Sequence, residues 1–138
     1  MADVLIATDA DWVYDEVEAA LGGDGTVTRV RAGADVAAAV VAAKPQLVVL
    51  DLQIGNMGGM ATCMTLRLDA GAGRVPQVPI LMLLDREPDV FLARRSQADG
   101  WLIKPLDAFR LSKAAKALLA GRTYVEGIPA DAAAPVPS

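Results

Sequence analysis

Three charged residues follow short apolar runs in this sequence. Asp9 follows the run at 4–7, Asp51 ends the run at 46–50, and Lys104 follows 101–103. Two carboxylates can hold a hard cation such as Mg²⁺, and an ammonium group can pair with a phosphate oxygen. An aspartate beside them can attack a phosphoryl group and form an acyl phosphate. These residue types favour phosphate chemistry over acid–base catalysis if the fold brings them together.

The composition excludes several other kinds of site. The 138 residues include no histidine, and Cys63 is the single cysteine. An intrachain disulfide, a multi-cysteine metal cage and a histidine-dependent triad are therefore excluded. Gly55, Gly58 and Gly59 do not form a dinucleotide fingerprint, because they follow the third expected strand rather than the first.

Charge and hydropathy limit the partners and the compartment. A net charge of −4 opposes direct binding to nucleic acid, which requires a basic surface. The 54% of hydrophobic residues include no uninterrupted apolar run long enough to span a membrane, so we expect no membrane insertion. The first twenty residues are acidic where a signal peptide is basic and then apolar, which predicts a cytoplasmic protein.

Apolar runs alternate with helical patterns along the chain. The runs QLVVL and ILMLL are typical of strands buried on both faces. Asp11 and Asp107 are expected helix caps, and Gly22 and Gly121 expected helix stops. The expected strands are 4–7, 26–30, 46–50, 80–84 and 101–103, and the expected helices lie near 12–21, 34–43, 60–68, 87–97 and 108–120.

This alternation predicts one α/β domain over residues 1–125, with a five-stranded parallel sheet and helices on both faces. Residues 126–138 are rich in proline and alanine and are expected to form a flexible tail, which leaves no room for a second, output domain. The functional crevice of such a sheet lies at the carboxyl ends of its strands. The residues at those ends are Thr8, Asp9, Asp51, Leu84, Asp85 and Lys104.

Four ordered segments carry a resemblance to a known family. They are VLIATDAD, QLVVLDLQIGNMGG, VPILMLLD and QADGWLIKPLD. Together they resemble the receiver domain of two-component response regulators, over about residues 3 to 121. The resemblance implies a flavodoxin-like, receiver-like (βα)5 sandwich.

The resemblance also implies roles for individual residues. Asp51 is similar to the phosphoacceptor, and Lys104 to the lysine that pairs with the phosphate. A Mg²⁺ cofactor would be held by Asp9, Asp51 and the backbone carbonyl of Gln53. Trp101 stands where the family has its switching aromatic residue.

The sequence departs from the family pattern at three positions. Thr8 replaces one of two acids after the first strand, which weakens the expected Mg²⁺ site, although Asp11 lies close enough in sequence to compensate in part. Leu84 replaces the serine or threonine of the second switch position and has no hydrogen-bonding group. Gly55 replaces a proline, which predicts a more mobile loop.

The leading hypothesis is a stand-alone receiver that is phosphorylated on Asp51 by a sensor histidine kinase or a phosphotransfer protein, with Mg²⁺, and signals by binding a target protein. The expected binding face, which would also serve a homodimer, comprises the fourth helix, fifth strand and fifth helix. Residues that could lie on it are Arg94, Arg95, Trp101, Lys113 and Lys116.

Two alternatives remain open at this point. Thr8 and Leu84 favour a degenerate receiver that binds partners independently of phosphorylation. An enzyme acting on a small substrate is the weaker alternative, because the chain lacks histidine, and we expect that the protein is not an enzyme.

Overall fold

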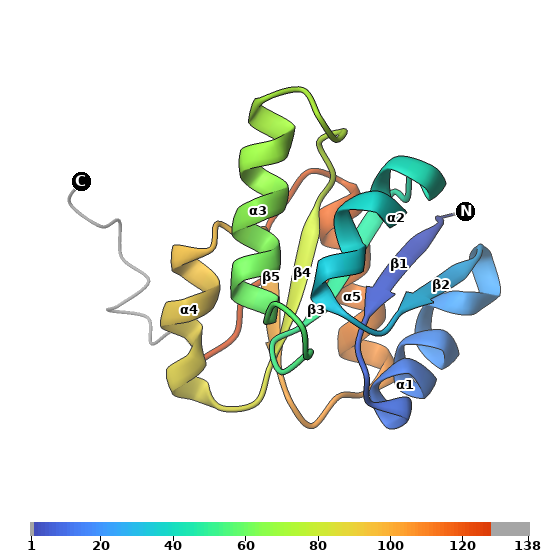
Figure 1. The fold of residues 1–138 in the computed structure, drawn as a ribbon. Helices are drawn as coiled ribbons and strands as arrows, with labels where there is room; N and C mark the ends of the chain where they lie inside the picture. Colours follow the sequence, from blue (N-terminus) through green and yellow to red (C-terminus); the bar gives the residue numbers. More distant parts are fainter. Residues whose placement is uncertain (1, 128–138) are drawn as a thin grey trace.

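Five parallel strands form one sheet in the computed structural model, which describes residues 2–127 (Figure 1). The strands are β1 (Val4–Ala7), β2 (Val27–Val30), β3 (Leu47–Asp51), β4 (Ile80–Leu84) and β5 (Gly100–Ile103). The helices are α1 (Asp11–Leu21), α2 (Val36–Ala43), α3 (Gly59–Gly71), α4 (Val90–Arg95) and α5 (Ala108–Leu119). The strand order is β2-β1-β3-β4-β5, so the expected fold class is confirmed.

The sheet separates two apolar cores. Helices α1 and α5 pack on one face, and α2, α3 and α4 pack on the other; Figure 1 shows α3 in front of the sheet and α5 behind it. Successive residues of a strand point to opposite faces. In β1, Val4 and Ile6 enter the core under α1 and α5, whereas Leu5 and Ala7 enter the other core. Burial on both faces explains why the central strands are uninterrupted apolar runs.

The helix expected over 87–97 is shorter in the structure. A 3-10 turn at Glu87–Asp89 precedes α4, because Pro88 has no N–H to donate and suits only a first turn. Gln97 has a φ of 66°, which takes the chain out of the helix. Helix α3 is longer than expected and continues to Gly71.

One of the two expected helix caps is wrong. Asp11 is the first residue of α1 rather than its cap, and its carboxylate forms an ion pair with Arg29 at 2.9 Å. Asp107 does cap α5 and accepts a hydrogen bond from the backbone N–H of Arg110 at 2.8 Å. The acid of α1 therefore contacts the neighbouring strand β2 instead of its own helix.

Within residues 2–127, no helix is both long and apolar enough to cross a bilayer.

Residues 128–138 of the predicted tail lie outside the described residues, whereas Glu126 and Gly127 are described. The Glu126 carboxylate accepts hydrogen bonds from Ile103 of β5 and Arg110 of α5.

Candidate functional site

The carboxyl ends of β1, β3, β4 and β5 bring the predicted phosphate-binding residues together. Asp51 ends β3 and is only 2% exposed. Lys104, which follows β5, donates from Nζ to Asp51 Oδ1 at 2.8 Å and to Asp85 Oδ1 at 2.8 Å. Asp85 directly follows β4. One ammonium group therefore joins two carboxylates across the β3, β4 and β5 ends.

Thr8 contacts the other oxygen of Asp51. Its hydroxyl donates to Asp51 Oδ2 at 2.7 Å and accepts a hydrogen bond from the backbone N–H of Ala10 at 3.1 Å. The backbone N–H of Gln53 donates to Asp51 Oδ1 at 3.2 Å. Both oxygens of this buried carboxylate are thus hydrogen-bonded, as burial of a charge requires. Thr8, at a position where the resemblance predicts an acid, is therefore a hydrogen-bond donor to the Asp51 carboxylate.

Lys104 stays protonated at this site. Burial lowers the pKa of Lys104, but the hydrogen bonds and charges of Asp51 and Asp85 outweigh burial and hold the pKa above its ordinary value. The Lys104 ammonium also lies 5.6 Å from the centre of the Trp12 ring, whose face attracts a cation. The site therefore presents a fixed positive charge beside Asp51.

Fewer carboxylates are available to hold Mg²⁺ than the sequence predicts. The exposed Asp9 side chain accepts a long hydrogen bond of 3.4 Å from the Gly55 N–H. Asp11, expected to compensate in part for Thr8, is paired with two arginines: Arg29 and Arg31 contact its Oδ1 at 2.9 and 3.5 Å and lower its pKa. Among residues 2–127, no group of three or more carboxylates or thiols gathers in a metal-binding arrangement.

Two carboxylates still fit a magnesium ion. Mg²⁺ usually retains several waters and takes only one or two protein carboxylates. Asp9 and Asp51 supply that number, and their oxygens are the hard ligands that Mg²⁺ prefers. The predicted contribution of the Gln53 carbonyl stays a prediction.

Both predicted switch positions are buried. Leu84 has no exposed surface and packs in the core shared by α2, α3 and α4. Trp101 belongs to the same core at 5% exposure, and its indole N–H donates to the backbone carbonyl of Glu126 at 2.9 Å. A role for either residue in signalling stays a prediction.

Four of the five residues expected on the binding face are exposed. Arg94 and Arg95 on α4 and Lys113 and Lys116 on α5 are all exposed. Trp101 differs, because its side chain points into the core. The four basic residues are thus accessible to a partner, and Trp101 is not.

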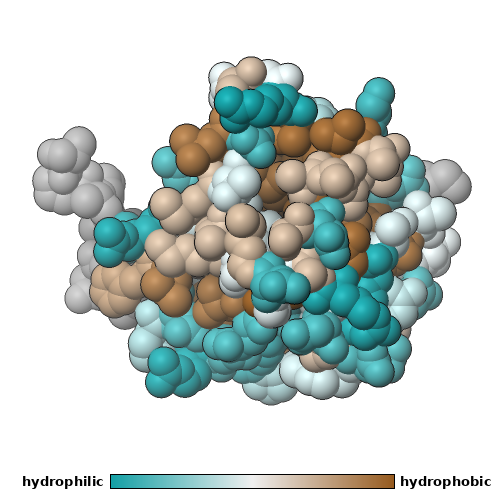
Figure 2. Space-filling view, viewed as in Figure 1, coloured by the Kyte–Doolittle hydropathy of each residue, from teal (hydrophilic) through white to brown (hydrophobic). Residues whose placement is uncertain are grey.

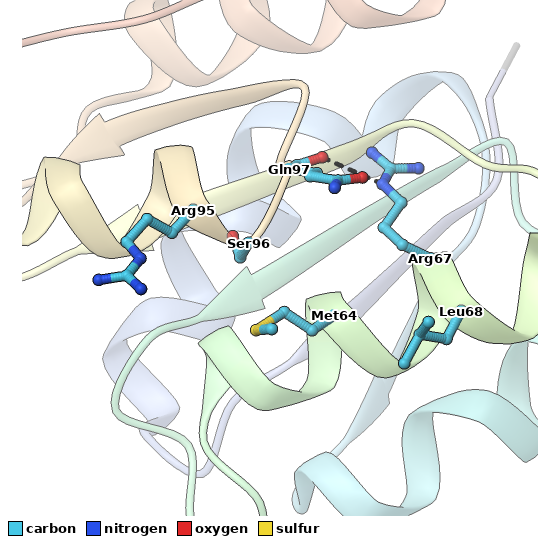
Figure 3. Close-up of a pocket in the computed structure, with 6 residues that line it drawn as sticks. All are labelled: Met64, Arg67, Leu68, Arg95, Ser96 and Gln97. Atoms are coloured by element: carbon cyan, nitrogen blue, oxygen red, sulfur yellow. Dashed lines mark hydrogen bonds between the residues drawn. The ribbon is translucent and has the colours of Figure 1, made fainter.

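A pocket of about 200 Å³ lies away from Asp51, between α3 and the end of α4 (Figure 3). Arg67 donates to the Gln97 carbonyl at 3.0 Å and pairs with Asp99 at 2.5 Å, so it links α3 to the start of β5. Figure 2 shows apolar side chains over α3 and α4 and hydrophilic ones along the carboxyl edge of the sheet. The pocket is lined by Met64, Arg67, Leu68, Arg95, Ser96 and Gln97.

Comparison with protein families decides the identity of this arrangement. Residues 4–116 match the response regulator receiver domain. The chain belongs to the response regulator receiver family. The five-stranded parallel sheet agrees with this family, whereas the roles expected of Asp51 and Lys104 stay predictions.

Two curated relatives differ in how much of their length this receiver matches. It is 34% identical over 105 residues to the DNA-binding response regulator MtrA of Mycolicibacterium smegmatis, covering 74% of this chain and 43% of that protein. The chain thus spans less than half the length of MtrA. It is 30% identical over 122 residues to the protein PilH of Pseudomonas aeruginosa, covering 88% of this chain and 100% of PilH.

Solved structures agree on the fold. A putative response regulator from Chloroflexus aurantiacus superposes with a TM-score of 0.77 at 24% identity, over 86% of this chain and 98% of that one. The chemotaxis protein CheY4 of Vibrio cholerae gives a TM-score of 0.72 at 24% identity, over 84% of this chain and 97% of that one. At this identity the likeness establishes the receiver fold alone.

Sequence reasoning missed two contacts of the site. Asp85 was identified at a strand end but not as the second partner of Lys104. The sequence signal for this contact is the position of Asp85 directly after β4, at the same edge of the sheet as Lys104. Thr8 was read as a missing charge, although a threonine hydroxyl can also donate a hydrogen bond, as it does to Asp51.

Proposed function

We propose that this receiver accepts a phosphoryl group on Asp51 from a histidine kinase or a phosphotransfer protein and signals by binding a target protein. The observation that carries the proposal is the contact of Lys104 Nζ with Asp51 Oδ1 at 2.8 Å, at the carboxyl edge of the sheet. A buried aspartate with a lysine beside it whose pKa is raised above its ordinary value suits an incoming phosphoryl group. We expect no turnover of other substrates, and the expected location is cytoplasmic.

The proposed step is a phosphoryl transfer between two side chains. A carboxylate oxygen of Asp51 attacks phosphorus of a phosphohistidine, the P–N bond breaks, and the imidazole leaves and takes up a proton. The product is an acyl phosphate on Asp51. Lys104 can exchange its contact with Asp51 for one with a phosphoryl oxygen, while Asp85 continues to hold the ammonium group.

Mg²⁺ would supply positive charge that reduces the repulsion between the Asp51 carboxylate and the negatively charged phosphodonor. Asp9 and Asp51 are the side chains that would hold the ion. Thr8 contributes no charge, so we propose that this receiver binds Mg²⁺ more weakly than one with two acids after β1.

The output of the proposed reaction is a change in binding. A target protein, or a second copy of the chain, would contact the face formed by α4, β5 and α5. The exposed arginines and lysines on α4 and α5 favour acidic partner surfaces there. The net charge of −4 supports a protein partner over nucleic acid.

Intact-mass spectrometry after incubation with a small acyl-phosphate donor and Mg²⁺ tests the proposal. The wild-type protein should gain the mass of one phosphoryl group, and Asp51→Asn should gain none. Asp15→Asn removes an exposed carboxylate on α1, outside the site, and is the matched control that should gain the same mass as the wild type. A folded wild-type protein that gains no mass would contradict the proposal and favour a binding module that works without phosphorylation.

A further inference from the structure

Residues 123–127 lie along the open edge of the sheet. In Figure 1 this last described segment runs from the end of α5 past β5 toward α4. Tyr124 forms a parallel bridge with Gly100, and its carbonyl accepts a hydrogen bond from the Trp101 N–H at 2.8 Å. An edge strand otherwise presents unpaired N–H groups to any extended chain that approaches it. Residues 123–127, here called the strap, therefore take the place of a sixth strand.

Glu126 fastens the strap to β5 and α5. Its carboxylate accepts hydrogen bonds from the Ile103 N–H at 3.0 Å and from Arg110 Nε at 2.8 Å, and Arg110 Nη2 also contacts Oε1. Its backbone carbonyl accepts a hydrogen bond from the Trp101 indole at 2.9 Å. A charge-assisted pair with two parallel donors from arginine is stronger and more selective than a neutral contact. One glutamate thus joins the strap to three residues.

The surface that receives the strap is held in shape by contacts of its own. Arg110 donates to the Ile103 carbonyl at 2.9 Å and to the Pro105 carbonyl at 2.8 Å, and it pairs with Asp107 at 3.1 Å. These partners fix the guanidinium whether or not Glu126 is present, so the donors are already placed for a carboxylate.

The β5 backbone is also shaped for close approach. A Cβ atom at Gly100 would lie 2.5 Å from the Tyr124 carbonyl oxygen, nearer than real Cβ contacts allow. Glycine at this position therefore lets the strap backbone reach hydrogen-bonding distance of β5.

We propose that the β5 edge is a docking site for an extended, glutamate-bearing segment, and that the chain's own strap occupies it and must be released before another segment can bind. The chemistry is a form of strand addition: the backbone N–H groups of Trp101 and Ile103 on β5 supply hydrogen bonds, and the Arg110 guanidinium selects the glutamate. The β5 edge is part of the face of α4, β5 and α5 proposed above for target binding, but this inference does not rest on that proposal, because it requires no phosphorylation of Asp51.

Hydrogen–deuterium exchange on the full chain tests the strap. Glu126→Gln removes the charge but keeps the side-chain shape, and the amides of Trp101 and Ile103 should then exchange about tenfold faster or more. The Lys104 amide is the internal control, because it donates to the Leu84 carbonyl of β4 at 2.8 Å. Glu18→Gln, an exposed residue on α1, is the matched charge control and should leave all three amides unchanged. Unchanged exchange in Glu126→Gln would overturn the assignment of Glu126 as the fastener.

A peptide added in trans tests the docking site. A fluorescent peptide with the sequence of residues 122–127 should bind the Glu126→Gln protein at least about tenfold more tightly than the wild type, whose own strap competes at a high effective concentration. A peptide with glutamine in place of glutamate should bind both proteins weakly. Equal binding of the first peptide to both proteins, or no binding to Glu126→Gln, would overturn the proposal.

Discussion

Replacing Thr8 by valine tests whether Thr8 acts through the charge of Asp51. Valine keeps the shape of threonine and replaces the hydroxyl by a methyl group; that hydroxyl donates to Asp51 Oδ2 at 2.7 Å in a fully buried position. A hydrogen bond to a charged group contributes about 1.5–3 kcal/mol, so we expect Thr8→Val to lower the free energy of unfolding by about 2 kcal/mol. For a domain of this size that corresponds to a melting temperature lower by roughly 7 °C.

Thr62 provides a matched control within the same protein. It is also buried, but its hydroxyl donates to a neutral acceptor, the Met57 carbonyl, at 3.1 Å. Thr62→Val should therefore cost about 1 kcal/mol, since a neutral hydrogen bond contributes less. The added methyl group is the same in both variants, but Thr8→Val also removes the acceptor of the Ala10 N–H. The difference between the two variants therefore reports the Asp51 charge together with that bond, and the double variant separates the two.

Urea denaturation of four proteins completes the experiment: wild type, Thr8→Val, Asp51→Asn and the double variant. If Thr8 acts through the Asp51 carboxylate, the two substitutions should not be additive, with a coupling free energy of about 1 kcal/mol. Equal destabilisation by Thr8→Val and Thr62→Val, or additive effects of Thr8→Val and Asp51→Asn, would refute the reasoning.

Three further predictions concern the same edge of the sheet. Lys104→Met leaves the Asp51 and Asp85 carboxylates without their shared cation, so it should lower the free energy of unfolding measured in urea by about 3 kcal/mol. Because the pKa of Lys104 is raised in the folded state, the stability that Lys104 contributes is present below pH 10.5 and is lost as the pH rises through the higher folded-state pKa. Melting temperatures measured at increasing alkaline pH check this loss. Leu84→Thr places a hydroxyl in an apolar core and should lower the free energy of unfolding by about 2 kcal/mol. The same change should strengthen any phosphorylation-linked change in partner binding. An unchanged response would mean that the coupling is lost elsewhere. Mg²⁺ should raise the melting temperature of the wild type more than that of Asp51→Asn, and the absence of any shift would favour phosphorylation-independent binding.

The order of elements could be predicted from the sequence, and the ends of the elements less well. Runs such as residues 80–84 are apolar throughout because helices cover both faces of the strand, and this pattern is local. Helix α4 is shorter than its polar pattern suggested, because Pro88 and the positive φ of Gln97 limit it at either end. Such limits depend on backbone geometry that hydrophobic periodicity does not record.

The sequence by itself determined which residues lie at the functional edge. Strands β1, β3, β4 and β5 end within one residue of the ends of their apolar runs. Parallel strands place those ends together, so Asp51 and Lys104 could be paired from the order of the chain alone. The four family-like segments added the expected roles.

Only the tertiary structure decided what these residues contact. Thr8 and Asp51 are separated by 43 positions, and the direction of the Thr8 hydroxyl follows from the register of β1 beside β3. Arg29 reaches Asp11 from the neighbouring strand β2 and removes it from the expected metal site. Glu126, the first residue of the predicted flexible tail, is held by Ile103 and Arg110. Each of these contacts joins segments far apart in the chain, and a local pattern of residue types carries no information about side-chain direction across such distances.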